Sequence, residues 1–250
     1  VRDWFRDNEP VVEEGYVTEL LGREAVALIE SHDPETPLFL YLAFTAPHAP
    51  YQAPQAYLDR YAHIADPSRR AYAAMITAMD EQIGRVVAAL ERQGMREDSI
   101  IIFQSDNGGP RDARFTGEVD MSQSLIPADN GPYRDGKASL YEGGTRVVAL
   151  ANWPGSIPVG TVVDQPIHIV DLYPTLVGLA GGSLAKSMPL DGLDVWATLS
   201  EGAPSPRSEV VYGIEPFRGA VRVGDWKLVC QATLPSRVEL YNLAEDPGET

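Results

Sequence analysis

Apolar and polar positions along the chain follow two different periods, and each period predicts regular structure. Apolar residues at spacings of three and four in residues 15–31 and 66–94 predict two amphipathic helices. Asp171 as N-cap and Gly181 as stop predict a shorter helix between them. Short apolar runs bounded by turn residues predict buried strands at 38–44, 98–105 and 147–151.

After residue 206 the pattern changes to short alternating runs, which predict an antiparallel meander. Its four runs are Ser208–Tyr212, Arg218–Val223, Trp226–Cys230 and Arg237–Tyr241. We therefore expect two parts, an α/β part in residues 1–205 with a mostly parallel sheet flanked by helices, and a small antiparallel β subdomain in residues 206–250.

The long helix predicted at 66–94 lies between two predicted strands, which is the order of a right-handed βαβ unit. Both strands would then end at the same edge of the sheet, where open α/β sheets bind ligands. His48 follows the first strand, and Asp106 and Asn107 follow the second. We expect these three side chains to lie on one side of the sheet.

Asp106 and Asn107 offer a carboxylate and an amide oxygen, the hard ligands that Ca²⁺ or Mg²⁺ prefers. Gly108 and Gly109 let the backbone turn tightly around a bound group, although the same four residues also suit an ordinary turn. His48 stands between prolines that stiffen its loop, and it is either a site residue or a structural one.

Residues 131–146 combine several glycines with Lys137 and lead into the strand predicted at 147–151. A cation at this place suits an anion site, although a surface lysine is the simpler reading. Glu142 and Arg146 have the spacing of a local ion pair. For His168, just before the short helix, we favour a structural hydrogen-bonding role over a ligand role.

Charge and cysteine content exclude several classes of partner. The formal net charge of −16 argues against nucleic acid and against an anionic membrane surface.

No apolar run reaches the ~18–20 residues of a membrane span, and the start has no signal-peptide pattern. Cys230 is the single cysteine, so no intrachain disulfide is possible. The opening at Val1 and the end at Thr250 suggest a chain cut at both ends.

Taken together, four motifs resemble those of the sulfatase family, in the alkaline phosphatase superfamily. They are Ala46–Pro50, Gln104–Gly109, Gly136–Arg146 and Asp171–Leu176. The resemblance implies an alkaline phosphatase-like fold and hydrolysis of a sulfate ester of a small molecule or carbohydrate. It also implies that Asp106 and Asn107 bind a divalent cation, usually Ca²⁺, with Mg²⁺ possible. His48 and Lys137 would contact the sulfate group.

Two parts of the family's active site are missing from this sequence. The formylglycine nucleophile is made from a Cys or Ser in a Cys/Ser-x-Pro-x-Arg motif, and two further aspartates complete the metal site; both would lie upstream of residue 1. Cys230 does not match, because Thr233 has the correct spacing before Pro235 and Arg237. We therefore expect this part of the protein to be inactive by itself and to bind metal poorly.

Two alternatives stay open. One is a phosphate or phosphonate ester hydrolase of the same superfamily, and the other is a non-catalytic homologue that has lost the nucleophile. The four histidines favour one metal over two, because a two-metal site needs more histidine ligands. Residues 111–130 are expected to form a loop at the mouth of the site. A periplasmic, secreted or lysosome-like location is expected.

Overall fold

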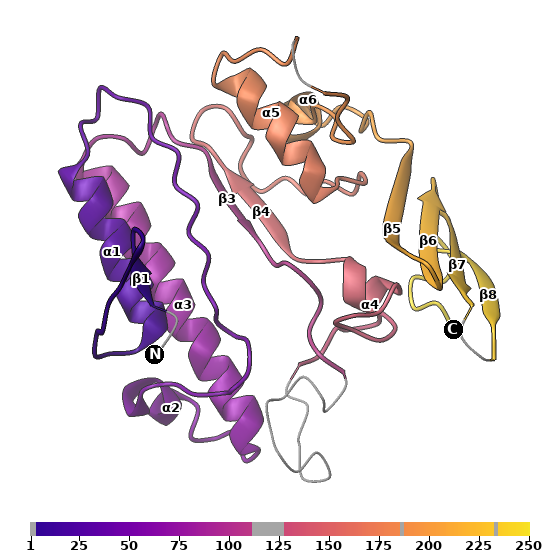
Figure 1. Ribbon diagram of the computed structural model, residues 1–250, viewed down its shortest axis with the longest axis horizontal. Helices are drawn as coiled ribbons and strands as arrows, with labels where there is room; N and C mark the ends of the chain where they lie inside the picture. The colour runs from indigo at the N-terminus through magenta and orange to yellow at the C-terminus, as the bar shows by residue number, and fades with distance from the viewer. Residues whose placement is uncertain (1–3, 112–127, 186–187, 233–234) are drawn as a thin grey trace. The chain divides into compact units, whose positions relative to one another are not determined.

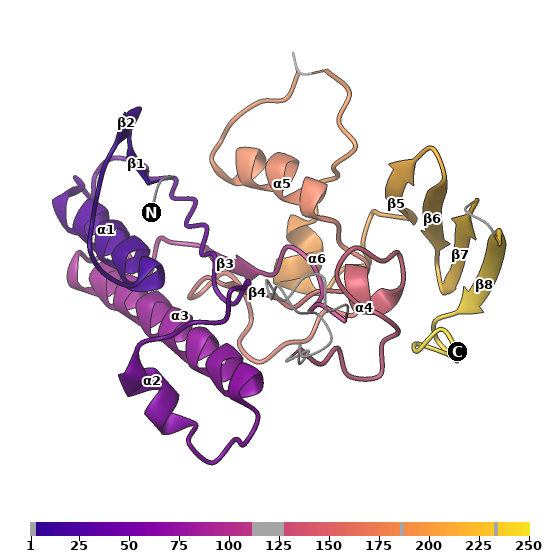
Figure 2. The same cartoon turned by 60° about the horizontal axis from the view of Figure 1, so that its bottom comes forward.

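The computed structural model describes residues 4–111, 128–185, 188–232 and 235–250. They belong to two compact units (Figures 1 and 2). The first unit holds the described residues up to Arg96 together with Ala128, and the second holds the described residues of Glu97–Arg111 and Asp129–Thr250. No helix among the described residues is long and apolar enough to cross a membrane. The predicted boundary at residue 206 stays a prediction.

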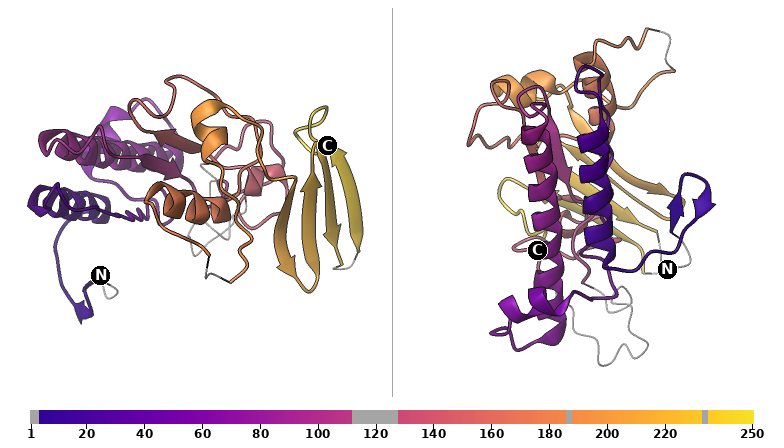
Figure 3. Two further views of the ribbon diagram at one scale, coloured as in Figure 1. Left: turned by 90° about the horizontal axis from the view of Figure 1, so that it is seen from above. Right: turned by 90° about the vertical axis from the view of Figure 1, so that its left-hand side faces the viewer.

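Two packed helices form the first unit: α1, Val17–Ser31, and α3, Pro67–Arg92. They run side by side in both views of Figure 3. A Cβ added at Gly22 of α1 would stand 2.5 Å from Gln82 Oε1 of α3, so the glycine permits the close approach. The hydrophobic periodicity predicted both helices correctly.

The ends of α3 follow the expected capping chemistry. Asp66 accepts hydrogen bonds from Ser68 N and Arg69 N at 2.8 and 3.1 Å, and Pro67 occupies the first turn. Gly94 follows the helix with φ of 70°. The smaller elements of this unit are β1, Phe5–Arg6, β2, Glu9–Pro10, and α2, Gln55–Arg60.

The strand predicted at 38–44 is not formed. Its residues alternate between exposed and half-buried, which is the period of an extended chain, but no described strand pairs with them. Phe39 and Tyr41 are 79% and 82% exposed. Strand structure requires a hydrogen-bonded neighbour as well as an apolar pattern, and the sequence of a run does not supply the neighbour. The predicted βαβ unit is therefore not formed by the residues that the structure describes.

The second unit contains a two-stranded antiparallel sheet, β3, Ile101–Gln104, with β4, Ala149–Asn152. Both were predicted as strands. Every strand pairing among the described residues is antiparallel, so the mostly parallel sheet expected from the apolar runs is not found there. The short helical elements of the unit are α4, Glu142–Thr145, η3, Ile169–Asp171, α5, Leu172–Leu179, and α6, Trp196–Glu201.

Four strands form the predicted meander in the order β5-β6-β7-β8 (Figure 3, left). Their bounds are Glu209–Glu215, Arg218–Val223, Trp226–Gln231 and Arg237–Asn242. One face buries Ala220 and Val229 against Leu140 and Tyr141. Leu140 and Tyr141 directly precede α4, so this face of the sheet supports the segment that contains Lys137.

Candidate active site

Asp106 and Asn107 follow β3 directly. Ser105 N donates to Val148 O at 3.0 Å and continues the pairing with the β4 side, and Ser105 Oγ donates to Asn107 O at 2.9 Å. Asn107 Nδ2 donates to Gly108 O at 2.8 Å, which turns its amide nitrogen toward the backbone and keeps Oδ1 as the acceptor. Asp106 is exposed. We call Ser105–Gly109 the acidic loop.

Three glycines let three backbone segments, the acidic loop among them, cross in close contact. A Cβ at Gly108 would stand 1.7 Å from Gly143 O, and one at Gly136 would stand 2.1 Å from Gly109 O. A Cβ at Gly143 would stand 2.3 Å from Arg134 O. None of these contacts is possible for a residue with a side chain. The three segments are the acidic loop, α4, and residues 134–139, which we call the lysine loop.

Lys137 lies in the lysine loop, and its backbone N donates to Gly109 O at 3.1 Å. Asp135 and Ala138 flank it with φ of 61° and 69°, a left-handed conformation that is unfavourable for residues other than glycine. Such backbone strain is concentrated at functional sites. The fold therefore brings the backbone of Lys137 to the acidic loop, whereas the role of its side chain stays a prediction.

Asn130 is a residue of this site that sequence reasoning missed. Its Oδ1 accepts from Gly109 N at 2.9 Å, and its Nδ2 donates to Gly109 O at 3.0 Å and to Asp135 O at 2.8 Å. One side chain thus joins the acidic loop to the lysine loop. A single Asn in a polar stretch carries no periodic or spacing signal that could reveal this role.

His48 belongs to the first unit, while the acidic loop and Lys137 belong to the second. Its backbone N donates to Thr45 O at 2.9 Å, and its Nδ1 lies 2.7 Å from Ala49 O. Because a carbonyl oxygen only accepts, Nδ1 carries the proton of this contact and Nε2 is the basic nitrogen of the neutral ring. The predicted approach of His48 to Asp106 stays a prediction.

A buried ionic cluster anchors α4 on the four-stranded sheet. Lys227 Nζ of β7 lies 2.9 Å from Glu142 Oε1 and 3.1 Å from Glu249 Oε1, and the three side chains are at most 2% exposed. Burial raises the pKa of Glu249. Arg146 lies 4.0 Å from Glu142, so the local pair predicted from sequence is present but is secondary to Lys227.

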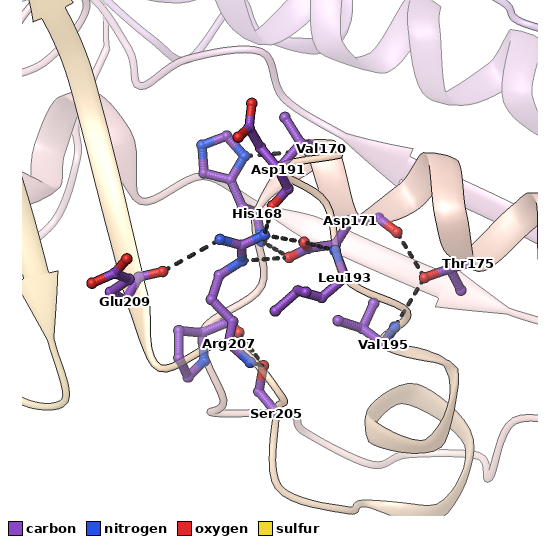
Figure 4. Close-up of polar contacts among 11 residues, drawn as sticks. His168, Val170, Asp171, Thr175, Asp191, Leu193, Val195, Ser205, Arg207 and Glu209 are labelled. Atoms are coloured by element: carbon purple, nitrogen blue, oxygen red, sulfur yellow. Dashed lines mark hydrogen bonds and ion pairs between the residues drawn. The ribbon is translucent and has the colours of Figure 1, made fainter. Parts of the chain in front are cut away.

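His168 and Asp171 form a structural cluster, shown in Figure 4. His168 is the N-cap of η3, because its Nδ1 accepts from Val170 N at 3.2 Å. Asp171 is the N-cap residue of α5, as predicted, but its side chain does not cap that helix; it is buried and accepts from His168 N, Leu193 N and the Arg207 guanidinium. The structural role that we favoured for His168 is confirmed.

Electrostatics in this cluster follow from the hydrogen bonds. Burial acts to raise the pKa of Asp171, but the hydrogen bonds from Arg207, Leu193 N and His168 N outweigh burial and hold that pKa below its usual value. Burial and the Arg207 charge lower the pKa of His168. A neutral His168 that already accepts a backbone hydrogen bond through Nδ1 is a poor candidate for a metal ligand.

The described residues fit part of a cation site. Asp106 and Asn107 supply two hard oxygens, whereas Ca²⁺ takes six to eight. In the parts of the chain that the structure describes, no three His, Cys, Asp or Glu side chains converge on one point. Cys230 is exposed in β7, paired across the ladder with Gly219 and Val238. Thr233 and most of the loop 111–130 lie outside the described residues.

Comparison with known proteins shows which family contains this chain. The family model named Sulfatase matches residues 1–183, and the chain belongs to the sulfatase family. Mouse arylsulfatase J is 39% identical over 84% of this chain and 33% of its own length. Mouse N-acetylgalactosamine-6-sulfatase is 31% identical over 90% of this chain and 42% of its own. The chain thus spans less than half the length of each of these two relatives.

Solved structures give the same result. The crystal structure of Ps i-CgsB in complex with a neocarrahexaose matches with a TM-score of 0.84 and 31% identity, over 98% of this chain and 52% of that one. The alkaline phosphatase-like fold class, with its small antiparallel C-terminal sheet, is confirmed. The error in the prediction concerns the pairing of strands within the described residues.

Proposed function

We propose that these residues are the central and C-terminal part of an enzyme that hydrolyses a sulfate monoester. The observation that carries the proposal is the crossing of glycine backbones, which joins Lys137 N to Gly109 O beside Asp106 and Asn107. A cationic side chain on a loop next to two hard oxygen ligands would create an environment for a tetrahedral anion.

Each candidate residue has a role that suits its chemistry. Asp106 and Asn107 would hold a divalent cation, Ca²⁺ by preference, which neutralises charge on the sulfate oxygens when bound. Lys137 would donate hydrogen bonds to those oxygens, and so would His48 once its Nε2 is protonated; one of the two would protonate the leaving alcohol. The remaining cation ligands and the formylglycine would come from residues outside this sequence.

We propose a sulfated carbohydrate as the substrate. The names of two similar proteins support this class: one relative is an N-acetylgalactosamine-6-sulfatase, and the Ps i-CgsB structure contains a neocarrahexaose. A periplasmic, secreted or lysosome-like location would suit such a substrate. An ester of phosphate or phosphonate is disfavoured, because a second metal needs histidine ligands and His168 already caps η3.

The test measures turnover by the full-length protein that contains these residues. 4-Nitrophenyl sulfate and a panel of sulfated sugars are compared with 4-nitrophenyl phosphate, with Ca²⁺ and after chelation. Asp106→Ala is expected to lower turnover by at least about 100-fold, because even outer-shell partners of a metal contribute ~10–100-fold. Asp80→Ala, on an exposed position of α3, is the matched control and should match the parent.

Two results would reject the proposal. One is faster hydrolysis of the phosphate ester than of any sulfate ester, which would favour the phosphatase alternative. The other is equal turnover by Asp106→Ala and Asp80→Ala. A complete gene without a Cys/Ser-x-Pro-x-Arg motif upstream of Val1 would favour the non-catalytic homologue.

A further inference from the structure

The lysine loop is held in an unfavourable backbone conformation by side chains from outside it. Asp135 and Ala138 adopt φ of 61° and 69° on either side of Gly136 and Lys137. The left-handed region is strained for a non-glycine residue, so two such residues need compensating contacts. Asn130 Nδ2 donates to Asp135 O at 2.8 Å, and Arg218 Nη1 donates to Ala138 O at 2.8 Å.

Asn130 also binds the acidic loop, through both backbone groups of Gly109. Gly109 O accepts from Lys137 N as well, at 3.1 Å. The carbonyl oxygen of Gly109 therefore accepts hydrogen bonds from Asn130 Nδ2 and from the backbone N of Lys137. The two loops share this one acceptor, and Asn130 contacts both.

We propose that Asn130 is a positioning residue that sets the distance between Lys137 and the cation ligands Asp106 and Asn107. The inference rests on the proposed sulfate-ester site. Asn130 does not touch the reacting group; it uses all of its amide geometry, one acceptor and two donors, to fix the two loops that do. A misplacement of about 1 Å between reacting groups can cost ~100-fold in rate.

The substitution Asn130→Asp distinguishes the hydrogen-bonding role of Asn130 from a role that depends only on the size of its side chain. The carboxylate keeps the size of the side chain and an acceptor for Gly109 N, but it loses both donors and faces the carbonyl oxygens of Gly109 and Asp135. Asn242→Asp is the matched control, because Asn242 Oδ1 only accepts, from Ala244 N at 3.1 Å, and the aspartate keeps that hydrogen bond. Both changes add one negative charge.

The experiment uses the full-length protein and three readouts: kcat and KM with a sulfate ester, Ca²⁺ affinity by calorimetry, and amide hydrogen exchange in residues 105–111 and 134–140. Asn130→Asp is expected to lower kcat by about 100-fold, weaken Ca²⁺ binding and speed exchange in both loops. Asn242→Asp should leave all three unchanged. Asn130→Gln, which keeps donors and acceptor on a longer side chain, should recover part of the exchange protection.

Each outcome separates the positioning role from the proposed function. Unchanged exchange in both loops of Asn130→Asp would overturn the inference. Activity per folded molecule equal to that of the parent would also overturn it, because the residue would then serve stability alone. If the parent protein hydrolyses no sulfate ester, the proposed function is refuted. Faster loop exchange in Asn130→Asp would then still support the role of Asn130 in holding the two loops together.

Discussion

At the scale of single residues, the type of a side chain predicts the chemistry it can perform better than it predicts the residues it contacts. Asp106, Asn107 and Lys137 were predicted from sequence because a metal or anion site needs those groups; the structure places them on adjacent loops, and their roles stay predictions. Asn130 could not be found, because its function depends on two backbone segments that converge only in the folded chain.

Lys137 gives the most direct test of the site. Lys137→Ala should lower kcat for a sulfate ester by roughly 10²–10³-fold, the loss seen when one preorganised donor is removed from an anion site. Lys137→Arg keeps the charge but changes its reach, so it should recover activity in part. Steady-state kinetics and the melting temperature of both variants provide the measurement. Activity of Lys137→Ala within twofold of the parent would remove Lys137 from the mechanism.

The lowered pKa of Asp171 predicts that the protein loses stability in acid. Its pKa is held below the usual value in the folded protein, so its contribution is complete above the unfolded pKa, near 3.8, and is lost as the pH falls through the folded pKa. Asp171→Asn should remove this dependence, and it should lower stability at neutral pH because Arg207 loses its partner. Denaturant unfolding at a series of pH values measures both effects; an identical acid dependence in the two proteins would contradict the assignment.

At the scale of elements, periodicity was sufficient for helices and insufficient for the sheet. The helices α1 and α3 satisfy their own backbone hydrogen bonds, so a local pattern and an N-cap such as Asp66 specify them. A strand depends on a partner that is distant in sequence. The run at 38–44 has a strand's composition but pairs with no described strand, and β3 pairs with β4 in antiparallel.

The glycines of the crossing provide a prediction with an internal control. Gly143→Ala places a Cβ against Arg134 O and should destabilise the protein and disturb both loops. Gly84→Ala, in α3 with no atom near its added Cβ, should instead stabilise by about 0.4–1 kcal/mol. Denaturant unfolding of the two variants gives the comparison. Similar free energies of unfolding for both would contradict the close backbone contact beside the acidic loop.

At the scale of the whole molecule, the four-stranded sheet is joined to the loops of the candidate site through buried charge. Glu142 begins α4, and Gly144 of the same helix accepts from Gly108 N at 3.1 Å in the acidic loop. Lys227 of β7 binds Glu142 from the sheet side. The sequence predicted the meander from its alternation but gave no sign that a lysine on its inner face would be fully buried.

This connection predicts that a substitution far along the sequence affects the loops. Lys227→Met leaves Glu142 and Glu249 buried without their cation, and breaking such a pair costs about 3–5 kcal/mol. The double variant Lys227→Met with Glu249→Gln restores part of the loss, because one of the two unpaired carboxylates is removed. Exchange in residues 105–111 should increase in the single variant and recover in the double variant. Equal exchange in all three proteins would show that the sheet does not support the acidic loop.

The same cluster predicts a pH dependence opposite in sign to that of Asp171. The folded pKa of Glu249 is raised above its ordinary 4.5, so the folded state binds this proton more tightly than the unfolded state. The stabilisation from Glu249 is complete below the unfolded pKa and is lost as the pH rises through the folded pKa. Glu249→Gln should therefore flatten the decline in unfolding free energy above pH 4.5. An unchanged slope would mean that Lys227 already keeps Glu249 ionised, and that the buried cluster carries no proton in the folded protein.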